Sequence, residues 1–410
     1  MLLASNRNYR LLFSASAVSN LGDGISALAF PWLATLITRD PTLIAMVAFA
    51  TRLPWLLFAI PAGVITDRVD RKALMVRADL FRLLLTGAVI ALILSVPAFP
   101  ITQHAASYIL ALSALAFLLG TAAVLRDNAA QTALPSVVDK AQLERANGQI
   151  WSIEQIMGSF VGPPLAGILI AFAVPAPFAV DALTFGLAAW MVWCIAMPTR
   201  VAPARRSIRV ETIEGARWVW AHKTILQLAV MLGLFNFAAI MATTILILYS
   251  QEILGLSAAG HGLLMTAGAL GGVLGGLISP AIAARLGRRA SLLTAIVVST
   301  IHFLLIAMTS SALVVAFALF LEMLAALLLN VVTVSYRQRR IPDDLLGRVN
   351  SIYRFFGWGT MPLGALVGGW LVAWGEPELG RDLALRLPYL VAGAVTGSML
   401  IYGLLRLRLR

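Results

Sequence analysis

The sequence predicts an all-α membrane protein with twelve transmembrane helices in two pseudo-symmetric six-helix bundles. Of its 410 residues, 60% are hydrophobic and only 12% are charged, whereas soluble domains carry roughly 25% charged residues. Apolar stretches of about 18 or more residues recur along the whole chain, and each can cross a hydrocarbon core about 30 Å thick as a helix. The mean hydropathy of +0.89 agrees with a chain that lies mostly in lipid.

The first apolar stretch follows a short basic N-terminus and is longer than a signal-peptide core of about 7–15 residues, so we expect a retained membrane helix. The remaining stretches are separated by polar or glycine- and proline-containing loops. The predicted spans cover residues 11–37, 43–66, 73–96, 105–126, 147–173, 177–197, 224–249, 258–284, 290–309, 312–335, 350–374 and 388–405.

Lys and Arg residues gather in alternate loops. One set of loops contains almost all of them, whereas the opposite loops contain only Arg39, Arg381 and Arg386. The positive-inside rule therefore predicts that both termini are cytoplasmic, in a multi-pass protein of the bacterial inner membrane. The net charge of +12 has the same origin. No basic-aromatic binding motif accompanies it, so we expect no nucleic-acid partner.

The longest polar stretch separates two halves of similar size. We expect a six-helix bundle over 1–197, a cytoplasmic linker over 198–223 and a second six-helix bundle over 224–410. Apolar residues from Ile208 to Trp220 recur at helical spacing, which predicts an interfacial amphipathic helix in the linker. The single cysteine, Cys194, excludes an internal disulfide. No residue group has metal-ligand spacing, and no metal or cofactor is predicted.

The two halves resemble each other in sequence. Leu143, Arg145 and Asn147 before the fifth span match Leu346, Arg348 and Asn350 in register before the eleventh span. Two similar rigid halves can rock about a central site, which favours a transporter. A membrane enzyme is disfavoured because no nucleophile–base set or phosphate loop is present. A sensor or scaffold would need an added soluble domain, and none fits.

Ionisable residues at membrane depth are the first functional candidates, because their burial is costly. A carboxyl group without a partner in an apolar site has a pKa near neutrality, as a proton carrier needs. By depth, Asp23, Glu154 and Glu322 are the proton-coupling candidates. A static buried ion pair, for example of Asp23 or Glu154 with Arg52 or Arg354, is the alternative. Asp79 and Arg82 are three residues apart and can pair along one helix face. Asp181 is assigned a structural role, and His302 a packed one.

Polar and aromatic side chains within the spans are candidates for a substrate pocket. Each is equally compatible with a membrane-interface or lipid-facing position. The pocket candidates are Trp151, Gln155, Phe235, Asn236 and Trp358.

Two motifs resemble signatures of the major facilitator superfamily, and the resemblance covers essentially the full chain. The segment Gly63-Val-Ile-Thr-Asp-Arg-Val-Asp-Arg-Lys72 resembles the loop signature between helices 2 and 3, with Asp70 where the pattern often has glycine. The resemblance implies that Asp67 helps to hold the outward-open state. The residues carried over as a gating motif are Gly63, Asp67, Arg68, Arg71 and Lys72.

The segment Gly158-Ser-Phe-Val-Gly-Pro-Pro-Leu-Ala-Gly167 resembles a motif of proton-coupled exporters, with Ala166 in place of a glycine. The resemblance implies a hinge and seal formed by Gly158, Gly162, Pro163 and Gly167, for which close helix packing is the alternative. Arg126-Asp-Asn128, placed at the end of the fourth span, resembles a degraded helix-4 arginine motif, so Arg126 is a third candidate charge partner. A topology arginine at a loop end is the alternative.

The Asn20–Asp23 run and the Asp181–Phe185 run resemble the macrolide-efflux and siderophore-exporter branch. The resemblance implies a proton-driven exporter of amphiphilic small molecules with protons as the coupling ion. The duplicated design needs no partner subunit to complete a pathway, so we expect a monomer. An importer or facilitator of a polar nutrient in the same fold is the alternative.

Overall fold

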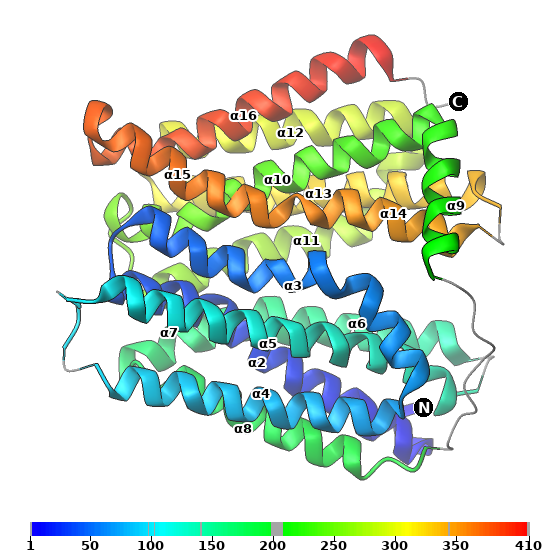
Figure 1. Ribbon diagram of the computed structural model, residues 1–410. Coiled ribbons are helices and arrows are strands. Elements are labelled where there is room, and N and C mark those ends of the chain that lie inside the picture. Colours follow the sequence, from blue (N-terminus) through cyan, green and yellow to red (C-terminus); the bar gives the residue numbers. More distant parts are fainter. Residues whose placement is uncertain are drawn as a thin grey trace. The chain divides into compact units, whose positions relative to one another are not determined.

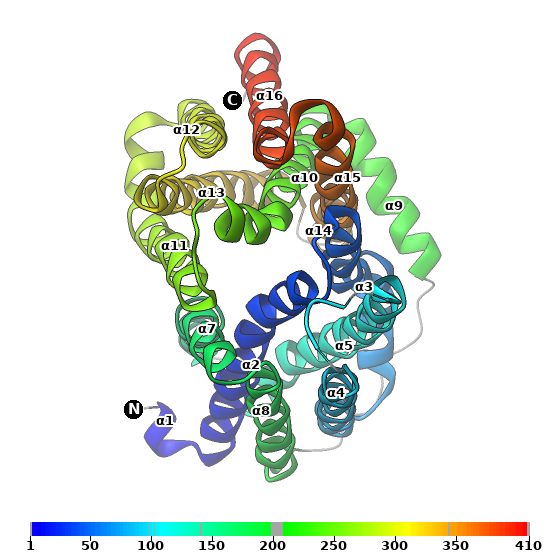
Figure 2. The same cartoon turned by 90° about the vertical axis from the view of Figure 1, so that its left-hand side faces the viewer.

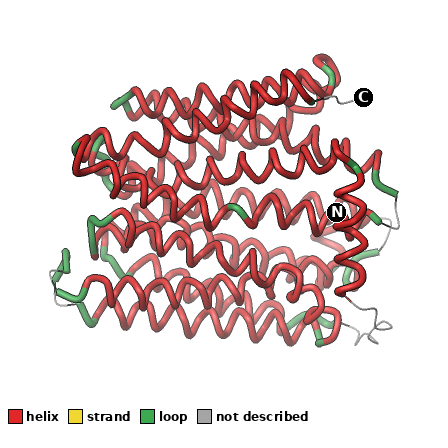
Figure 3. Tube along the Cα trace, turned by 45° about the horizontal axis from the view of Figure 1, so that its top comes forward, coloured by secondary structure: helices red, strands yellow, loops and turns green. Residues whose placement is uncertain are grey.

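The computed structural model describes residues 2–96, 98–101, 103–139, 142–197, 208–342 and 345–407. Within these ranges the chain is almost entirely helical and contains no strand (Figure 3). Each of the twelve predicted spans coincides with one helix or with a run of consecutive helices, which confirms the predicted fold class. The chain divides into two compact units. The first comprises Met1–Arg39, Met46–Ala204 and Ser257–Leu263, and the second Asp40–Ala45, Arg205–Leu256 and Leu264–Arg410.

The first half of the chain carries six long helical runs (Figure 1). The fifth is continuous but changes its winding, from α6 through the π-helix η3 into α7. The helices are α1 (Leu2–Ser5), α2 (Arg7–Ile37), α3 (Pro41–Arg68), α4 (Arg71–Leu94), α5 (Ala105–Ala133), the 3₁₀ turn η1 (Leu134–Ser136), α6 (Leu143–Gln155), η3 (Ile156–Val161), α7 (Gly162–Phe172) and α8 (Ala176–Trp193).

The second half repeats this pattern after a short helix, α9, in the predicted linker. Its fifth run is again made of two consecutive helices, α14 and α15. The helices are α9 (Ile208–Ala221), α10 (Lys223–Glu252), α11 (Ala258–Leu286), α12 (Arg288–Met308), α13 (Ala312–Arg340), α14 (Leu346–Gly359), α15 (Met361–Leu379) and α16 (Arg381–Arg406).

Ten helical segments within the described ranges are long and apolar enough to cross a membrane. The runs α2 and α4 are not among them, although each is long enough. Both carry polar groups in their middle parts: Asn20 and Asp23 on α2, and Asp79 and Arg82 on α4. Since lipid does not solvate such groups, α2 and α4 must bury them against protein.

Several helices extend beyond their predicted spans. Helix α5 continues to Ala133, seven residues past the predicted end, and α16 begins at Arg381, seven residues before the predicted start. Hydropathy marks only the apolar part of a helix, whereas the backbone hydrogen bonds continue into polar residues. The correction matters for Arg126, which was placed at the end of the fourth span but lies seven residues before the end of α5 and is fully buried.

In the N-terminal unit, α2, α4, α5 and α8 lie side by side (Figure 2). Helix α4 packs against α5 and α8, and α2 packs against α8 and α7. Apolar contact alone does not drive helices together in lipid, so this packing relies on close fit and on polar contacts between helices. The polar residues of α2 and α4 face each other within this group, as described below.

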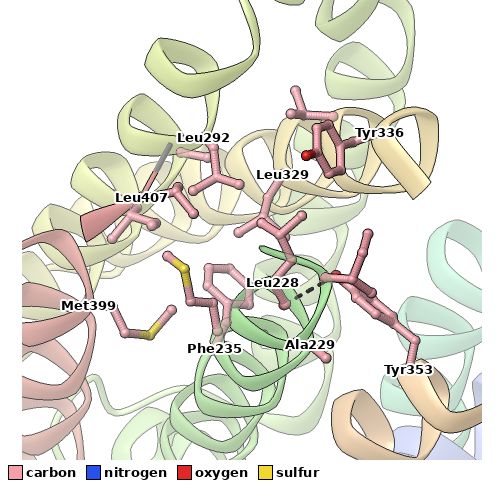
Figure 4. Close-up of a cluster of buried hydrophobic side chains, with 14 of the residues drawn as sticks. Leu228, Ala229, Phe235, Leu292, Leu329, Tyr336, Tyr353, Met399 and Leu407 are labelled. Carbon is pink, nitrogen blue, oxygen red and sulfur yellow. Dashed lines mark hydrogen bonds between the residues drawn. The ribbon is translucent and has the colours of Figure 1, made fainter. Parts of the chain in front are cut away.

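The C-terminal unit has its own apolar core where α10, α12, α13, α14 and α16 meet (Figure 4). Phe235 and Leu228 of α10 lie in it, and the hydroxyl of Tyr353 donates a hydrogen bond of 3.2 Å to the backbone oxygen of Leu228. Helix α9 packs on α10 and α14. Its Val219 is buried in this core, whereas Trp220 is exposed and lies beside the ring of Phe356.

Two basic residues from the sparsely charged loops are held at the end of this unit. Arg381 forms ion pairs of 2.8 Å with Glu252 of α10 and 2.9 Å with Glu376 of α15. Arg386 pairs with Asp382 at 2.9 Å and donates to the backbone oxygen of Ala307 at 2.9 Å. Both arginines therefore join helix ends. This structural role explains why they occur in loops that otherwise contain few basic residues.

Candidate functional site

The candidate site is a cluster of acidic and basic side chains inside the N-terminal unit. At its centre, Arg82 of α4 forms an ion pair with Asp23 of α2. The same guanidinium donates to the hydroxyl of Ser19 at 3.2 Å and lies 3.6 Å from Asp79. It also stacks over the ring of Phe185 from α8, with the carbon at its centre 3.7 Å from the ring centroid. Arg82 thus joins three helices.

A second arginine extends the cluster to α5. The Nε of Arg126 lies 3.6 Å from Asp79, and its Nη1 lies 3.7 Å from Asp127. Its Nη2 donates a hydrogen bond of 3.3 Å to the backbone oxygen of Ala15 on α2. Asp79 is therefore placed between two guanidinium groups, and both of its carboxyl oxygens are buried without an ordinary hydrogen bond from the described residues.

Asp181 of α8 closes the cluster on the other side. Its carboxylate accepts a hydrogen bond of 2.5 Å from the hydroxyl of Ser26 on α2 and contributes to the electrostatic field at Arg82. Gly22 packs directly against Asp181 and Thr184, where a Cβ atom would overlap both side chains. The absence of a side chain at position 22 is what allows α2 to approach α8 so closely.

Exposure divides the acids of the cluster into two groups. The side chains of Asp23 and Asp127 are 39% and 35% exposed, whereas that of Asp79 is fully buried. Glu154 of α6 is half-buried, and the charges of Asp127, Arg126 and Asp23 act on it. The cluster therefore has a dry interior at Asp79 and Arg126, and accessible carboxyl groups at its margin.

The glycine-rich motif lies next to this cluster. Gly158 lies in η3, where the chain winds as a π-helix directly before Pro163 and Pro164. π-Helical turns inside α-helices are rare and occur often at functional sites. Gly158 and Gly162 pack against Gly24, one residue after Asp23, and a Cβ on Gly162 would lie 2.6 Å from the Cα of Gly24.

The other end of the motif packs against residues at the start of α11 that belong to the same unit. A Cβ on Gly167 would lie 2.5 Å from the backbone oxygen of Ala258, and one on Gly262 would lie 2.7 Å from that of Pro163. Close packing, the alternative reading of this motif, is therefore present on two sides of α7.

This packing gives a test of stability. We expect Gly162→Ala to lower the free energy of unfolding by about 1–3 kcal/mol, because the new methyl group forces α7 away from Gly24. Gly148→Ala on α6 is the matched control. A Cβ there meets nothing within 4 Å, and alanine favours the helix by about 0.5–1 kcal/mol. Thermal unfolding of the purified proteins measures both, and equal midpoints would contradict the packing assignment.

The gating motif is described in part. Asp70 accepts a hydrogen bond of 2.7 Å from the backbone of Ala73 and caps the start of α4. This explains how aspartate replaces the usual glycine at that position. Arg71 donates to the backbone oxygen of Thr132 near the end of α5, at 2.5 Å, where a positive charge complements the helix dipole. Arg68 is exposed and Lys72 half-buried. The surroundings of Gly63 and the side chain of Asp67 lie outside what the structure describes.

The remaining charged candidates do not join the N-terminal cluster. Arg52 on α3 is exposed and forms none of the ion pairs identified among the described residues. Glu322 of α13 is buried in the C-terminal unit, where its charge acts on His302 of α12. The side chain of Arg354 lies outside the described residues.

The pocket candidates occupy different environments. Trp151 and Gln155 are exposed near Glu154. Asn236 of α10 donates a hydrogen bond of 2.8 Å to the backbone oxygen of Gly357 on α14. Trp358, on the same helix, is half-buried, whereas Phe235 is buried in the apolar core.

Sequence reasoning missed part of the cluster. Asp127 was not selected, because the fourth span was ended at residue 126. Arg82 was paired only with Asp79 on its own helix, although it also binds Asp23 of α2. The occurrence of ionisable residues at similar depth in the first, third, fourth and sixth spans was the signal that could have brought them together. No metal-binding group of three or more His, Cys, Asp or Glu occurs among the described residues.

Two named relatives cover almost the whole chain, and a third covers about two thirds of it. The multidrug efflux pump Tap of Mycolicibacterium fortuitum is 26% identical over 402 residues, which cover 94% of each protein. The protein of the same name from Mycobacterium tuberculosis is 27% identical over 400 residues, covering 94% of this chain and 91% of that protein. The staphyloferrin A transporter of Staphylococcus aureus is 23% identical over 283 residues, or 68% of each.

Solved structures share the fold at low sequence identity. A bacterial homologue of the iron transporter ferroportin in the inward-facing state has a TM-score of 0.74 at 16% identity, covering 96% of this chain and 98% of that one. The nucleoside transporter NupG has a TM-score of 0.76 at 12% identity, covering 98% and 99%.

These relatives are membrane transporters, so the expectation of a multi-pass transporter of small molecules rather than an enzyme is confirmed. The family described as transmembrane secretion effector matches residues 3–407. The chain therefore belongs to the transmembrane secretion effector family of the major facilitator superfamily.

Proposed function

We propose that this protein is a proton-coupled exporter of amphiphilic small molecules that works by alternating access. The full-length similarity to a multidrug efflux pump, and the partial similarity to a siderophore transporter, support drugs, macrolides or siderophores as the substrate class. The single observation that carries proton coupling is the acidic excess of the cluster around Arg82.

The acidic excess is a matter of charge balance. The charges of Asp23, Asp79, Asp127 and Asp181 act on Arg82, and Arg126 adds a second positive charge. Four carboxylates thus face two guanidinium groups inside a helical bundle. Two uncompensated negative charges in a low-dielectric interior are costly, so the cluster favours taking up protons.

Asp23 and Glu154 are the proton carriers in this proposal, because each is accessible and faces the field of the cluster. When Asp23 takes up a proton, its attraction to Arg82 weakens, and Arg82 then interacts mainly with Asp79. When the proton leaves, the ion pair between Asp23 and Arg82 re-forms. A bundle with two such arrangements can bias the protein between its two states, as coupling requires.

The other assignments fit the same cycle. Residues 1–197 and 224–410 would act as the two moving halves, with 198–223 as linker, and Asp67 would help to hold the outward-open state. The π-helix before Gly162 and Pro163 would supply the hinge. The protein would act as a monomer in the bacterial inner membrane, with both termini in the cytoplasm as the charge asymmetry of the loops favours.

The test is a flux measurement in liposomes that contain the purified full chain. A pH gradient is imposed, and the export of ethidium, erythromycin and staphyloferrin A is followed together with proton movement. We expect proton flow opposite to the flux of at least one compound, and a loss of that coupling by about tenfold or more in Glu154→Gln.

Glu378→Gln, the same chemical change at an exposed position of α15, is the matched control. Flux without proton movement, equal in the wild type and in Glu154→Gln, would overturn proton coupling. That outcome would favour a facilitator in the same fold.

A further inference from the structure

A second pair of ionisable residues lies inside the C-terminal unit, between α12 and α13. His302 is 3% exposed and Glu322 is 8% exposed. Glu322 is the side chain whose charge acts on His302, and its Oε2 is buried without a hydrogen bond from the described residues. A buried acid with an unsatisfied oxygen, whose charge acts on a buried histidine, calls for a proton or a cation.

Hydrogen bonding determines the tautomer of the neutral His302 ring. The Nδ1 of His302 lies 2.8 Å from the backbone oxygen of Ala318. A carbonyl oxygen only accepts, so Nδ1 carries the hydrogen and the neutral ring leaves Nε2 as an acceptor. In an α-helix this oxygen also accepts from the backbone N–H of residue 322. The ring of His302 is therefore at the level of Glu322 along α13.

No other acid or base competes for this proton among the described residues that act on His302. The helices packed on α12 and α13 carry their ionisable groups closer to their ends, where several have other partners. Tyr249 and Arg386 donate hydrogen bonds to backbone oxygens at the end of α12. The ring of Tyr389 contacts that of Tyr249. The ionisable groups of these elements are Lys223, Tyr249 and Glu252 of α10, His261 and Arg285 of α11, Arg288 and Arg289 of α12, Tyr336, Arg337, Arg339 and Arg340 of α13, and Arg381, Asp382, Arg386, Tyr389, Tyr402 and Arg406 of α16.

We propose that His302 and Glu322 form a second proton-holding site, in which protonated Glu322 donates its hydrogen to Nε2 of His302. One proton is taken up by the carboxylate, no bond other than O–H is formed or broken, and the pair changes from a net charge of −1 to zero. This site is separate in sequence and in structural unit from the cluster around Arg82. A role of this site in transport rests on the proposed function, whereas the proton-holding pair itself does not depend on that function.

The test needs no transported compound. The full chain, labelled with ¹⁵N at its histidines, is placed in lipid nanodiscs and titrated with acid, and His302→Gln assigns the resonance of His302 among the four histidines. We expect a hydrogen on Nδ1 and an unprotonated Nε2. Glu322→Gln should abolish the pH-dependent change at Nε2, whereas Glu378→Gln should leave it unchanged.

Infrared difference spectra supply a second measurement on the acid itself. The C=O band of a protonated carboxyl group should appear on acidification and be absent in Glu322→Gln. In His302→Gln it should appear at a pH at least about one unit away, a tenfold change in proton affinity. A hydrogen on Nε2 of the neutral ring would overturn the proposal, even if proton-coupled export were established. So would a Glu322 C=O band that appears at the same pH in His302→Gln as in the wild type. Conversely, the pair would survive a finding that export is not proton-coupled.

Discussion

Asp23→Asn is expected to abolish uphill export while leaving exchange of substrate across the membrane intact. Asparagine keeps the size of the side chain but neither takes up a proton at neutral pH nor forms an ion pair with Arg82. The proton gradient then has no carrier at this end of the cluster, and uphill flux should fall by about tenfold or more. Exchange without a proton step should persist, because the helices that move are unchanged. Both rates are measured in the same liposomes, with and without a pH gradient.

The control for this variant is Asp382→Asn. It makes the same chemical change on α16, where the carboxylate is exposed and pairs with Arg386. It should retain uphill flux. Wild-type uphill flux in Asp23→Asn would remove Asp23 from the mechanism, and loss of exchange together with uphill flux would show that the residue supports folding or substrate binding instead.

Much of the fold was predictable because the membrane imposes it. Length, hydropathy and the placement of basic residues are enough to mark twelve spans, since only helices and closed barrels satisfy their backbone in lipid. The helix ends were less predictable. Hydropathy ends the fourth span at the polar Arg126 and leaves Arg381 outside the twelfth span, although both residues lie within helices.

The charged residues of the site were predictable, but their partners were not. Hydropathy places Asp23 at membrane depth, yet the rotation of α2 about its axis decides which helix it faces. That rotation depends on the close packing of Gly22 on α8 and of Gly24 on α7 and η3. Neither contact is visible in a hydropathy profile. The π-helix was equally hidden, because neither the glycine spacing nor the two prolines that follow it specify a change of helical winding.

Arg82 should be the residue of the N-terminal unit whose loss costs the most stability. In Arg82→Met the side chain keeps its bulk, but the carboxylate of Asp23 loses its ion pair, and Asp79 keeps only Arg126. Removing one member of a buried ion pair costs about 3–5 kcal/mol, and here the fully buried carboxylate of Asp79 is the charge that loses compensation. We expect a lower unfolding temperature in detergent and reduced yield from the membrane. Arg82→Lys should recover only part of the loss, since an ammonium cannot both bind Asp23 and stack on Phe185.

Two further variants separate this effect from a general loss of positive charge. Arg77→Met makes the same change five residues earlier on α4, where the side chain is exposed, and should leave the unfolding temperature near that of the wild type. The double variant Asp79→Asn with Arg82→Met removes one charge of each sign from the cluster and should be more stable than Arg82→Met alone, because Arg126 then needs to balance one carboxylate fewer. If Arg82→Met unfolds at the wild-type temperature, or the second substitution worsens it, the buried charges are not coupled in the way that the geometry around Arg82 requires.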